Sequence, residues 1–204
     1  SIFENADKKH TNSILSTKNN MLITSAKNTN IVGENIEANN IDLNVKDLSI
    51  ASALDTSYSK NFGASITGTA VVGMATNTLF TGGVSTTGYI SYNESKSNTV
   101  GKQSGLIAKN TLNGNVKGNA NLVAAVVGGS SGDLKIAGTT AVKNLNIFEK
   151  SGGASVSIGG RTNAAVKSVT ADINIDNHIE KTGVLKSGIG IALNGTFDHG
   201  FNKD

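Results

Sequence analysis

The sequence contains no cysteine, no proline and no tryptophan, and aromatic residues make up only 4% of its 204 residues. Large aromatic side chains normally fill the middle of a thick core. Their scarcity therefore predicts a thin, layered core built from Ile, Leu, Val and Ala. The lack of proline, together with aliphatic residues that recur at short intervals, excludes a disordered or linker-like chain. The lack of cysteine leaves the compartment open, because β-rich secreted proteins can do without disulfides.

Strong charge of either sign is also missing, since the formal net charge is +3 and Arg161 is the only arginine. Nucleic-acid-binding domains usually gather Arg and Lys on one face, whereas the lysines here are scattered, so no nucleic-acid partner is expected. No signal peptide is apparent, and no apolar run approaches the ~20 residues of a membrane helix. Both ends are expected to be cut from something longer, because neither carries a start signal or a cap.

What the chain does contain is a repeat of about 20 residues. When NNMLITSAKNTNI (19–31) is placed above NNIDLNVKDLSI (39–50), Asn19-Asn20 falls on Asn39-Asn40 and Met21 on Ile41. Further along, Ile31 falls on Ile50 after a slip of one residue. Periods of this length are typical of solenoids, in which each short unit buries its apolar face only by stacking on the next. The pattern predicts stacked aliphatic columns, with Asn ladders at the turns as in other stacked β structures.

The same pattern resumes at GLIAKNTLNGNVKGNANLVAAVV (105–127) and GDLKIAGTTAVKNLNIF (132–148). Two stretches interrupt it. In 57–103, alternating apolar residues run from Phe62 to Met74 and resume after Gly82-Gly83, which predicts a long antiparallel hairpin. Residues 149–200 alternate in the same way and predict a second excursion, and no segment has helical periodicity. We expect coils at 1–56 and 104–148, the first excursion at 57–103, and a second excursion or appended sheet at 149–204.

Three segments follow one another in a recognisable order: NIEANNIDLNVKDLSIASALDTS (35–57), GASITGTAVVGMA (63–75) and YNESKSNTVGKQSGLIAKNTL (92–112). Together they resemble the filamentous-haemagglutinin repeat region of two-partner-secretion exoproteins, a group that includes adhesins, haemolysin-like exoproteins and the stalks of contact-dependent growth-inhibition toxins. The first segment resembles the family's rung pattern and the junction that follows it, and the second is similar to the Gly/Ser-rich run after that junction. The third is similar to the family's return segment and its Q(S/T)GxxA coil start. The resemblance covers 12–148, and no QSG-like restart is apparent after the second excursion.

The resemblance implies an all-β fold, a right-handed parallel β-helix with antiparallel hairpin excursions. It also implies a secreted protein on the bacterial cell surface, exported by an outer-membrane partner transporter. The chain would be a non-catalytic filament segment that serves adhesion or contact-dependent toxin delivery, with no cofactor and no toxin domain of its own. Its further partners would be a receptor on a host cell or a neighbouring bacterium, or the lipid of an outer membrane.

Catalysis is weighed because β-helix folds also include polysaccharide-degrading enzymes. Such enzymes need clustered carboxylates, often with a metal ion, and only Asp42, Asp47 and Asp55 come close to forming a cluster. The histidines His10, His178 and His199 lack metal-ligand spacing, and each is expected to be a solvated side chain. We therefore expect no enzyme, no catalytic residue and no metal site. The Gly-rich segment GGSSGD (128–133) lacks the GK(S/T) ending of a phosphate loop and predicts a β-turn.

If a surface binds a partner, the excursions are the place to look, because elements that interrupt a regular scaffold often carry function. The candidate interaction surface consists of six side chains: Tyr58, Phe62, Ile66, Val72, Ile90 and Tyr92. Two explanations of the alternation stay open. The apolar side could pack against the β-helix, or it could associate with an outer membrane, since membrane strands need about 9–11 residues with one apolar side.

Overall fold

The structure is a computed structural model that describes residues 1–74, 80–163 and 167–191. In these ranges every regular element is a strand, which confirms the all-β prediction, and no helix long and apolar enough to cross a membrane occurs among them. In chain order the strands are β1 (Ile2–Lys8), β2 (Ser13–Ser16), β3 (Asn20–Val32), β4 (Glu34–Ala51), β5 (Asp55–Met74), β6 (Phe80–Thr99), β7 (Ser104–Val116), β8 (Ala120–Val123), β9 (Ala125–Ser131), β10 (Leu134–Ile136), β11 (Thr140–Lys143), β12 (Leu145–Asn163), β13 (Lys167–Leu185) and β14 (Gly188–Ile191).

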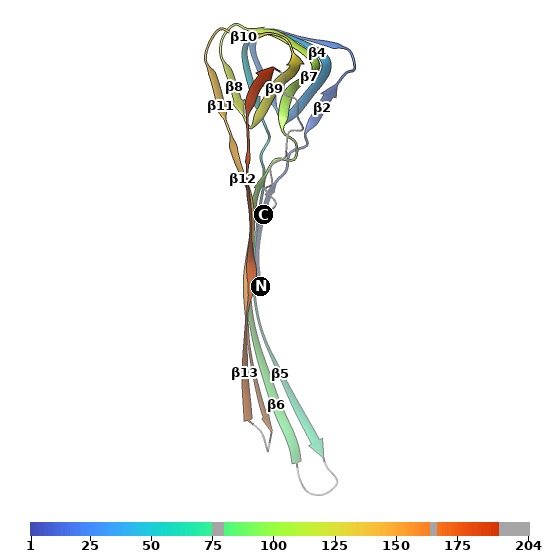
Figure 1. Ribbon diagram of the computed structural model, residues 1–204. Coiled ribbons are helices and arrows are strands. Elements are labelled where there is room, and N and C mark those ends of the chain that lie inside the picture. Colours follow the sequence, from blue (N-terminus) through green and yellow to red (C-terminus); the bar gives the residue numbers. More distant parts are fainter. Residues whose placement is uncertain (75–79, 164–166, 192–204) are drawn as a thin grey trace. The chain divides into compact units, whose positions relative to one another are not determined.

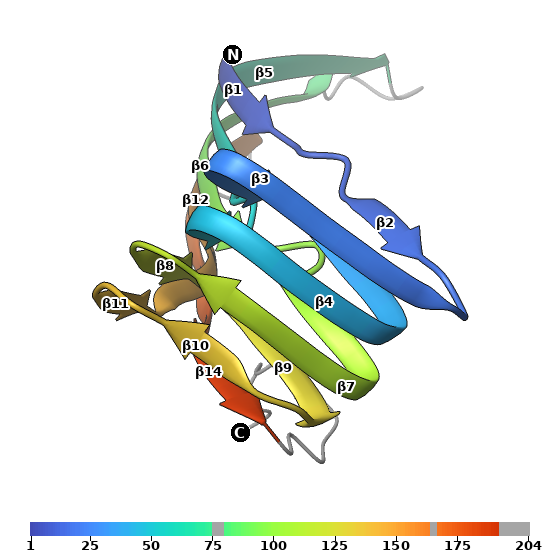
Figure 2. The same cartoon turned by 90° about the horizontal axis from the view of Figure 1, so that it is seen from above.

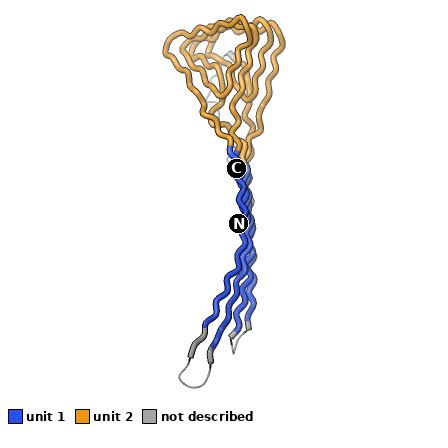
Figure 3. Tube along the Cα trace, turned by 180° about the vertical axis from the view of Figure 1, so that it is seen from behind, with its two compact units in different colours: residues 1–7, 57–96, 149–180 blue, residues 8–56, 97–148, 181–204 orange. Residues whose placement is uncertain are grey.

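The strands form two separate sheets, and Figure 1 labels most of their strands. The chain accordingly divides into two compact units, shown in Figure 3. One, the β-helix unit, comprises residues 8–56, 97–148 and the described part of 181–204. The other, the sheet unit, comprises residues 1–7, 57–96 and 149–180, and its strand order is β1-β5-β6-β12-β13.

The β-helix unit is a stack of parallel coils, and Figure 2 shows β3, β4, β7 and β9 running side by side. The first coil is β2 with β3, the second is β4, the third is β7 with β8, and the fourth is β9 with β10 and β11. Strand β14 begins a fifth coil by pairing in parallel with β9. The parallel β-helix predicted from the repeat is confirmed.

The register between the first two coils is the one that the sequence predicts. Met21 pairs with Ile41, and Asn20 pairs with Asn40. The register shifts between Ser25 and Asn28, so that Ile31 pairs with Ile50, as the one-residue slip requires. The expected Asn ladder is also present, because the Asn40 side chain donates a hydrogen bond of 2.8 Å to the Asn20 side chain.

Stacked aliphatic side chains form the core of the β-helix unit. One column runs through all the coils, and another is centred on Ile41, which pairs with Met21 on one side and Leu112 on the other. Ile41 and Leu112 are completely buried. Members of the first column, from the first coil to the fifth, are Leu15, Ile36, Leu106, Val127 and Ile189. Each coil is thin, so its aliphatic side chains are buried by the neighbouring coils rather than by a second layer.

Both excursions leave the coils at the same corner of the β-helix. Between the first and second coils a single residue, Gly33 (φ +69°), turns this corner, and between the third and fourth coils Ala124 (φ +48°) does so. These left-handed conformations are easy for glycine and uncommon for alanine. After the second and fourth coils the same corner is replaced by residues 52–103 and 144–187, because Ala51 pairs with Val123, which pairs with Lys143.

The sheet unit is antiparallel. Thr69 on β5 lies beside Ser85 on β6, with 2.6 Å between their hydroxyl oxygens, while Gly63 lies beside Ser91. The pairing therefore runs in opposite directions along the two strands, which confirms the predicted long hairpin. The order of the strands in this sheet is their order along the chain.

One expectation needs correction. Residues 128–133 are not a turn throughout, because β9 continues to Ser131 and only Gly132, at φ +125°, and Asp133 separate it from β10. A coil restart also follows the second excursion, although no QSG-like restart is apparent in the sequence. Gly188 and Gly105 both pair with Val126, so Lys186-Ser187-Gly188 occupies the position of Gln103-Ser104-Gly105. Because Lys186 stands where the first restart has Gln103, the second restart does not match the QSG pattern.

Candidate functional site

The sheet unit has one polar and one apolar side. The contacts of Thr69 with Ser85 and of Gly63 with Ser91 place the odd-numbered residues of β5 and β6, most of which are Ser, Thr or Gly, on one side. A Cβ added to Gly159 of β12 would lie 3.1 Å from the hydroxyl oxygen of Thr170 on β13. Thr170 therefore lies on the same polar side of the sheet. Because side chains alternate along a strand, the neighbours of these residues all lie on the opposite side.

That opposite side is apolar and exposed, and we call it the apolar face. The exposed fraction is 84% for Ile66, 80% for Val169 and 73% for Ile175. Side chains this exposed have no layer packed above them. Its larger members come from four strands: Phe62, Ile66, Val84, Ile90, Tyr92, Val156, Ile158, Val169, Ile173 and Ile175. Soluble proteins rarely expose a continuous apolar surface of this kind unless it binds something.

The structure places five of the six predicted surface residues on this face. Phe62 and Ile66 come from β5, Ile90 and Tyr92 from β6, and Tyr58 lies half-buried near the start of β5. Val72 belongs to β5, but its side chain lies outside the described residues. The alternation of β12 and β13 is visible in the sequence, but it does not indicate that these strands join the first hairpin in one sheet. Binding by these residues stays a prediction.

Of the two explanations for the alternation, packing against another layer finds no support within the sheet unit. This unit consists only of the strands of the single sheet and the segments that join them. Its described apolar side chains have no layer of their own unit to pack on.

Charged side chains mark the end of the apolar face at Tyr92. The ammonium of Lys60 lies 5.8 Å from the centroid of the Tyr92 ring, which is within the range of a cation–π interaction. The Tyr92 hydroxyl donates a hydrogen bond to Glu94, and this bond raises the pKa of the Tyr92 phenol. On the neighbouring strands, Lys150 forms an ion pair with Glu180 at 2.5 Å.

An open depression of about 510 Å³ lies beside Tyr92. Gly152 and Gly153 of β12 are among its lining residues, and the lack of side chains there leaves the space between β6 and β13. Tyr92, Lys150 and Ile175 line it from the three strands β6, β12 and β13. The depression is continuous with the apolar face and belongs to the same surface.

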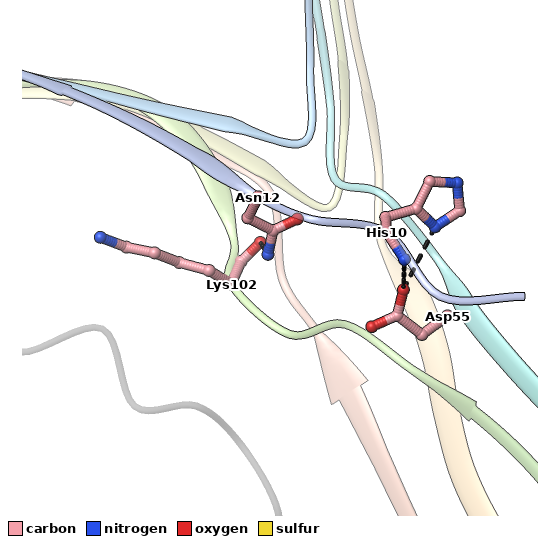
Figure 4. A network of polar contacts seen from close by, with 4 residues as sticks. All are labelled: His10, Asn12, Asp55 and Lys102. Atoms are coloured by element: carbon pink, nitrogen blue, oxygen red, sulfur yellow. Dashed lines mark hydrogen bonds and ion pairs between the residues drawn. The ribbon is translucent and has the colours of Figure 1, made fainter.

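Polar side chains of the β-helix unit tie together the segments that pass near its corner. The backbone N–H of His10 donates to the Asp55 carboxylate at 2.6 Å, and His10 Nδ1 lies 3.2 Å from the same oxygen (Figure 4). Nearby, the Asn12 amide donates to the carbonyl oxygen of Lys102 at 3.3 Å. His10 was expected to be a solvated side chain, but its contact with Asp55 gives it a structural partner at this junction.

Two serines close the corner itself. Ser52 is buried, accepts a hydrogen bond of 2.8 Å from the backbone N–H of Ser104, and donates one to the carbonyl oxygen of Ala124. At the second excursion the Ser187 hydroxyl makes the equivalent pair of hydrogen bonds: it accepts one from the backbone N–H of Ala125 and donates one to the carbonyl oxygen of Lys143. Each hydroxyl supplies a donor and an acceptor, which suits a corner where strands must begin and end. Sequence reasoning missed both serines, because an isolated serine gives no signal.

The candidate catalytic residues are not brought together. Asp47 accepts a hydrogen bond from the backbone N–H of Asn119 at 2.8 Å, while Asp55 contacts His10. Asp42 is exposed on β4. Among the described residues no group of three or more His, Cys, Asp or Glu side chains could hold a metal ion. His199 lies outside the described residues, as does the side chain of His178.

Comparison with known proteins identifies part of the chain. Residues 4–64, from β1 into β5, match the family described as Hemagglutinin repeat. This segment is a repeat of the filamentous-haemagglutinin type. No curated protein and no solved structure matches the chain. The predicted resemblance is confirmed, and the repeat accounts for the coils: the match contains all of β2, β3 and β4.

Proposed function

We propose that this chain is a non-catalytic segment of a large secreted exoprotein, in which the coils are a scaffold and the sheet unit is the interaction surface. The haemagglutinin repeat supports the scaffold role. The observation that carries the proposal is the apolar face, on which Ile66 is 84% exposed. The full-length protein would be exported by an outer-membrane partner transporter and displayed on the bacterial cell surface, where it serves adhesion or contact-dependent toxin delivery.

A second candidate function is association with the outer membrane of a target cell. Strands that contact lipid need about 9–11 residues with one apolar side, and β5 and β6 are each long enough. Tyr92 and the lysines beside it lie at one end of the apolar face, an arrangement that suits a membrane interface, where Tyr and Lys are favoured.

Flotation with vesicles of outer-membrane lipid, followed by alkaline extraction, tests this second function. We expect the wild-type chain to float, and the double variant Ile66→Asp/Ile90→Asp to lose about tenfold of its binding, since 1.4 kcal/mol suffices for tenfold and charge on a lipid-facing side costs more. The matched control is Thr67→Asp/Ser91→Asp, which changes the polar side of the same strands. Equal flotation of both double variants would refute membrane association through the apolar face.

A further inference from the structure

We propose that in water the apolar face is covered by the same face of a second copy of this chain. The result would be a two-layer sandwich of two sheet units related by a twofold axis. This goes beyond the proposed function, since it names the occupant of the face when no membrane is present. A twofold interface uses the same patch on both copies, so a self-complementary surface is its only requirement.

The size of the apolar face fits a stable dimer. Four strands carry it, and their apolar stretches are about nine residues long, which gives roughly 19 by 30 Å, or roughly 600 Å² in projection. The accessible area of a face with protruding side chains exceeds its projection. A standard protein interface buries about 800 Å² on each partner, so one face against its copy reaches the required range.

The shape of the apolar face, with protruding and open positions, also suits packing against a second sheet. Gly68 of β5 and Gly160 of β12 lie on the apolar face, and a Cβ added at either would meet nothing within 4 Å. These open positions lie among the protruding side chains of Ile66 and Ile158. Packed sheets interdigitate large and small side chains across a gap of about 10 Å, so isoleucines of one copy can enter the glycine positions of the other.

Charged side chains gather at one end of the apolar face, so the part of the proposed interface that excludes water lies away from that end. At the Tyr92 end, Lys60, Lys96 and Lys150 stand near the acidic residues Glu94 and Glu180. Both signs are present, so this end forms a polar rim without strong repulsion between copies. Beyond it, the described side chains of the face are apolar or small except for Thr86 and Thr162, and this is close to the composition of an interface core with a polar rim.

Sedimentation velocity of the wild-type chain over a wide concentration range, without lipid or detergent, tests the proposal. We expect a reversible dimer. Ile158→Asp should weaken association by roughly a hundredfold or more, because an aspartate would be buried in an apolar interface. The matched control Ser157→Asp, on the polar side of the same strand, should dimerise like the wild type. Both sites are exposed or half-exposed in one copy, so both variants should fold.

A second matched pair on another strand, Ile173→Asp with Asn174→Asp as control, protects the test against a folding failure on β12. Far-UV circular dichroism identifies any variant that does not fold. A wild-type chain that stays monomeric at every concentration would overturn the proposal, as would equal dissociation by the apolar-face variants and their controls. Vesicle flotation separates this proposal from membrane association: a dimer that does not float refutes only membrane association, and a monomer that floats refutes only the dimer.

Discussion

Replacing Ile41 by alanine is expected to lower the free energy of unfolding of the β-helix unit by about 2–5 kcal/mol, the usual cost of truncating a buried aliphatic side chain to alanine. Ile41 is completely buried and pairs with Met21 in the coil before and Leu112 in the coil after. A cavity at this position interrupts the column on both sides. Because coils are stabilised by their neighbours, the loss affects three coils.

Urea denaturation followed by far-UV circular dichroism measures this effect, since the chain has no tryptophan to report by fluorescence. The matched control is Leu22→Ala. Leu22 is next to Met21 on β3 but 74% exposed, and its truncation should change stability by less than about 0.5 kcal/mol. If Leu22→Ala were as destabilising as Ile41→Ala, the assignment of inside and outside along the coils would be wrong.

Replacing Ser52 by alanine is expected to cost about 2–4 kcal/mol, although only one oxygen atom is removed. The Ser52 hydroxyl binds the N–H of Ser104 and the carbonyl of Ala124 at a buried position. The variant leaves both backbone groups without this partner, and each buried group left unsatisfied costs about 1–3 kcal/mol. The same denaturation experiment measures the loss.

Two further variants test whether the hydroxyl itself is responsible. Ser130→Ala removes an exposed hydroxyl that donates to the Lys109 carbonyl at 2.6 Å, and should change stability by only about 0.5 kcal/mol, since water can replace the bond. Ser52→Thr keeps the hydroxyl and should retain more stability than Ser52→Ala. A Ser52→Ala variant as stable as Ser130→Ala would show that the corner does not depend on this serine.

The coils could be predicted from the sequence because stacking makes the repeat visible. Residues that share a column must be alike, so Met21 above Ile41 and Asn20 above Asn40 reveal the register directly. The slip between Ser25 and Asn28 could also be read, because the aliphatic residues on either side of it still match. A repeat of this kind therefore allows the register between neighbouring coils to be predicted from the sequence.

The arrangement of the excursions could not be predicted in the same way. Alternation shows which residues of β5 share a side, but it is identical for a packed hairpin and an exposed one. Alternation also does not show that β12 and β13 join β5 and β6 in one sheet. The excursions leave the coils at one corner of the β-helix. The corner is formed by single residues such as Gly33 and Ala124 and by the serine hydroxyls, none of which makes a pattern in the sequence.

The measurement that tests the central claim most directly is a cysteine scan of β5 from Ala64 to Ala70. The chain has no native cysteine, so each single-cysteine variant can carry one polarity-sensitive fluorophore without background labelling. When the apolar face is covered, by lipid vesicles or by self-association, emission should shift to the blue at the even-numbered positions 64, 66, 68 and 70 only. Equal emission at odd and even positions under both conditions would contradict the claim that one side of this sheet is the interaction surface.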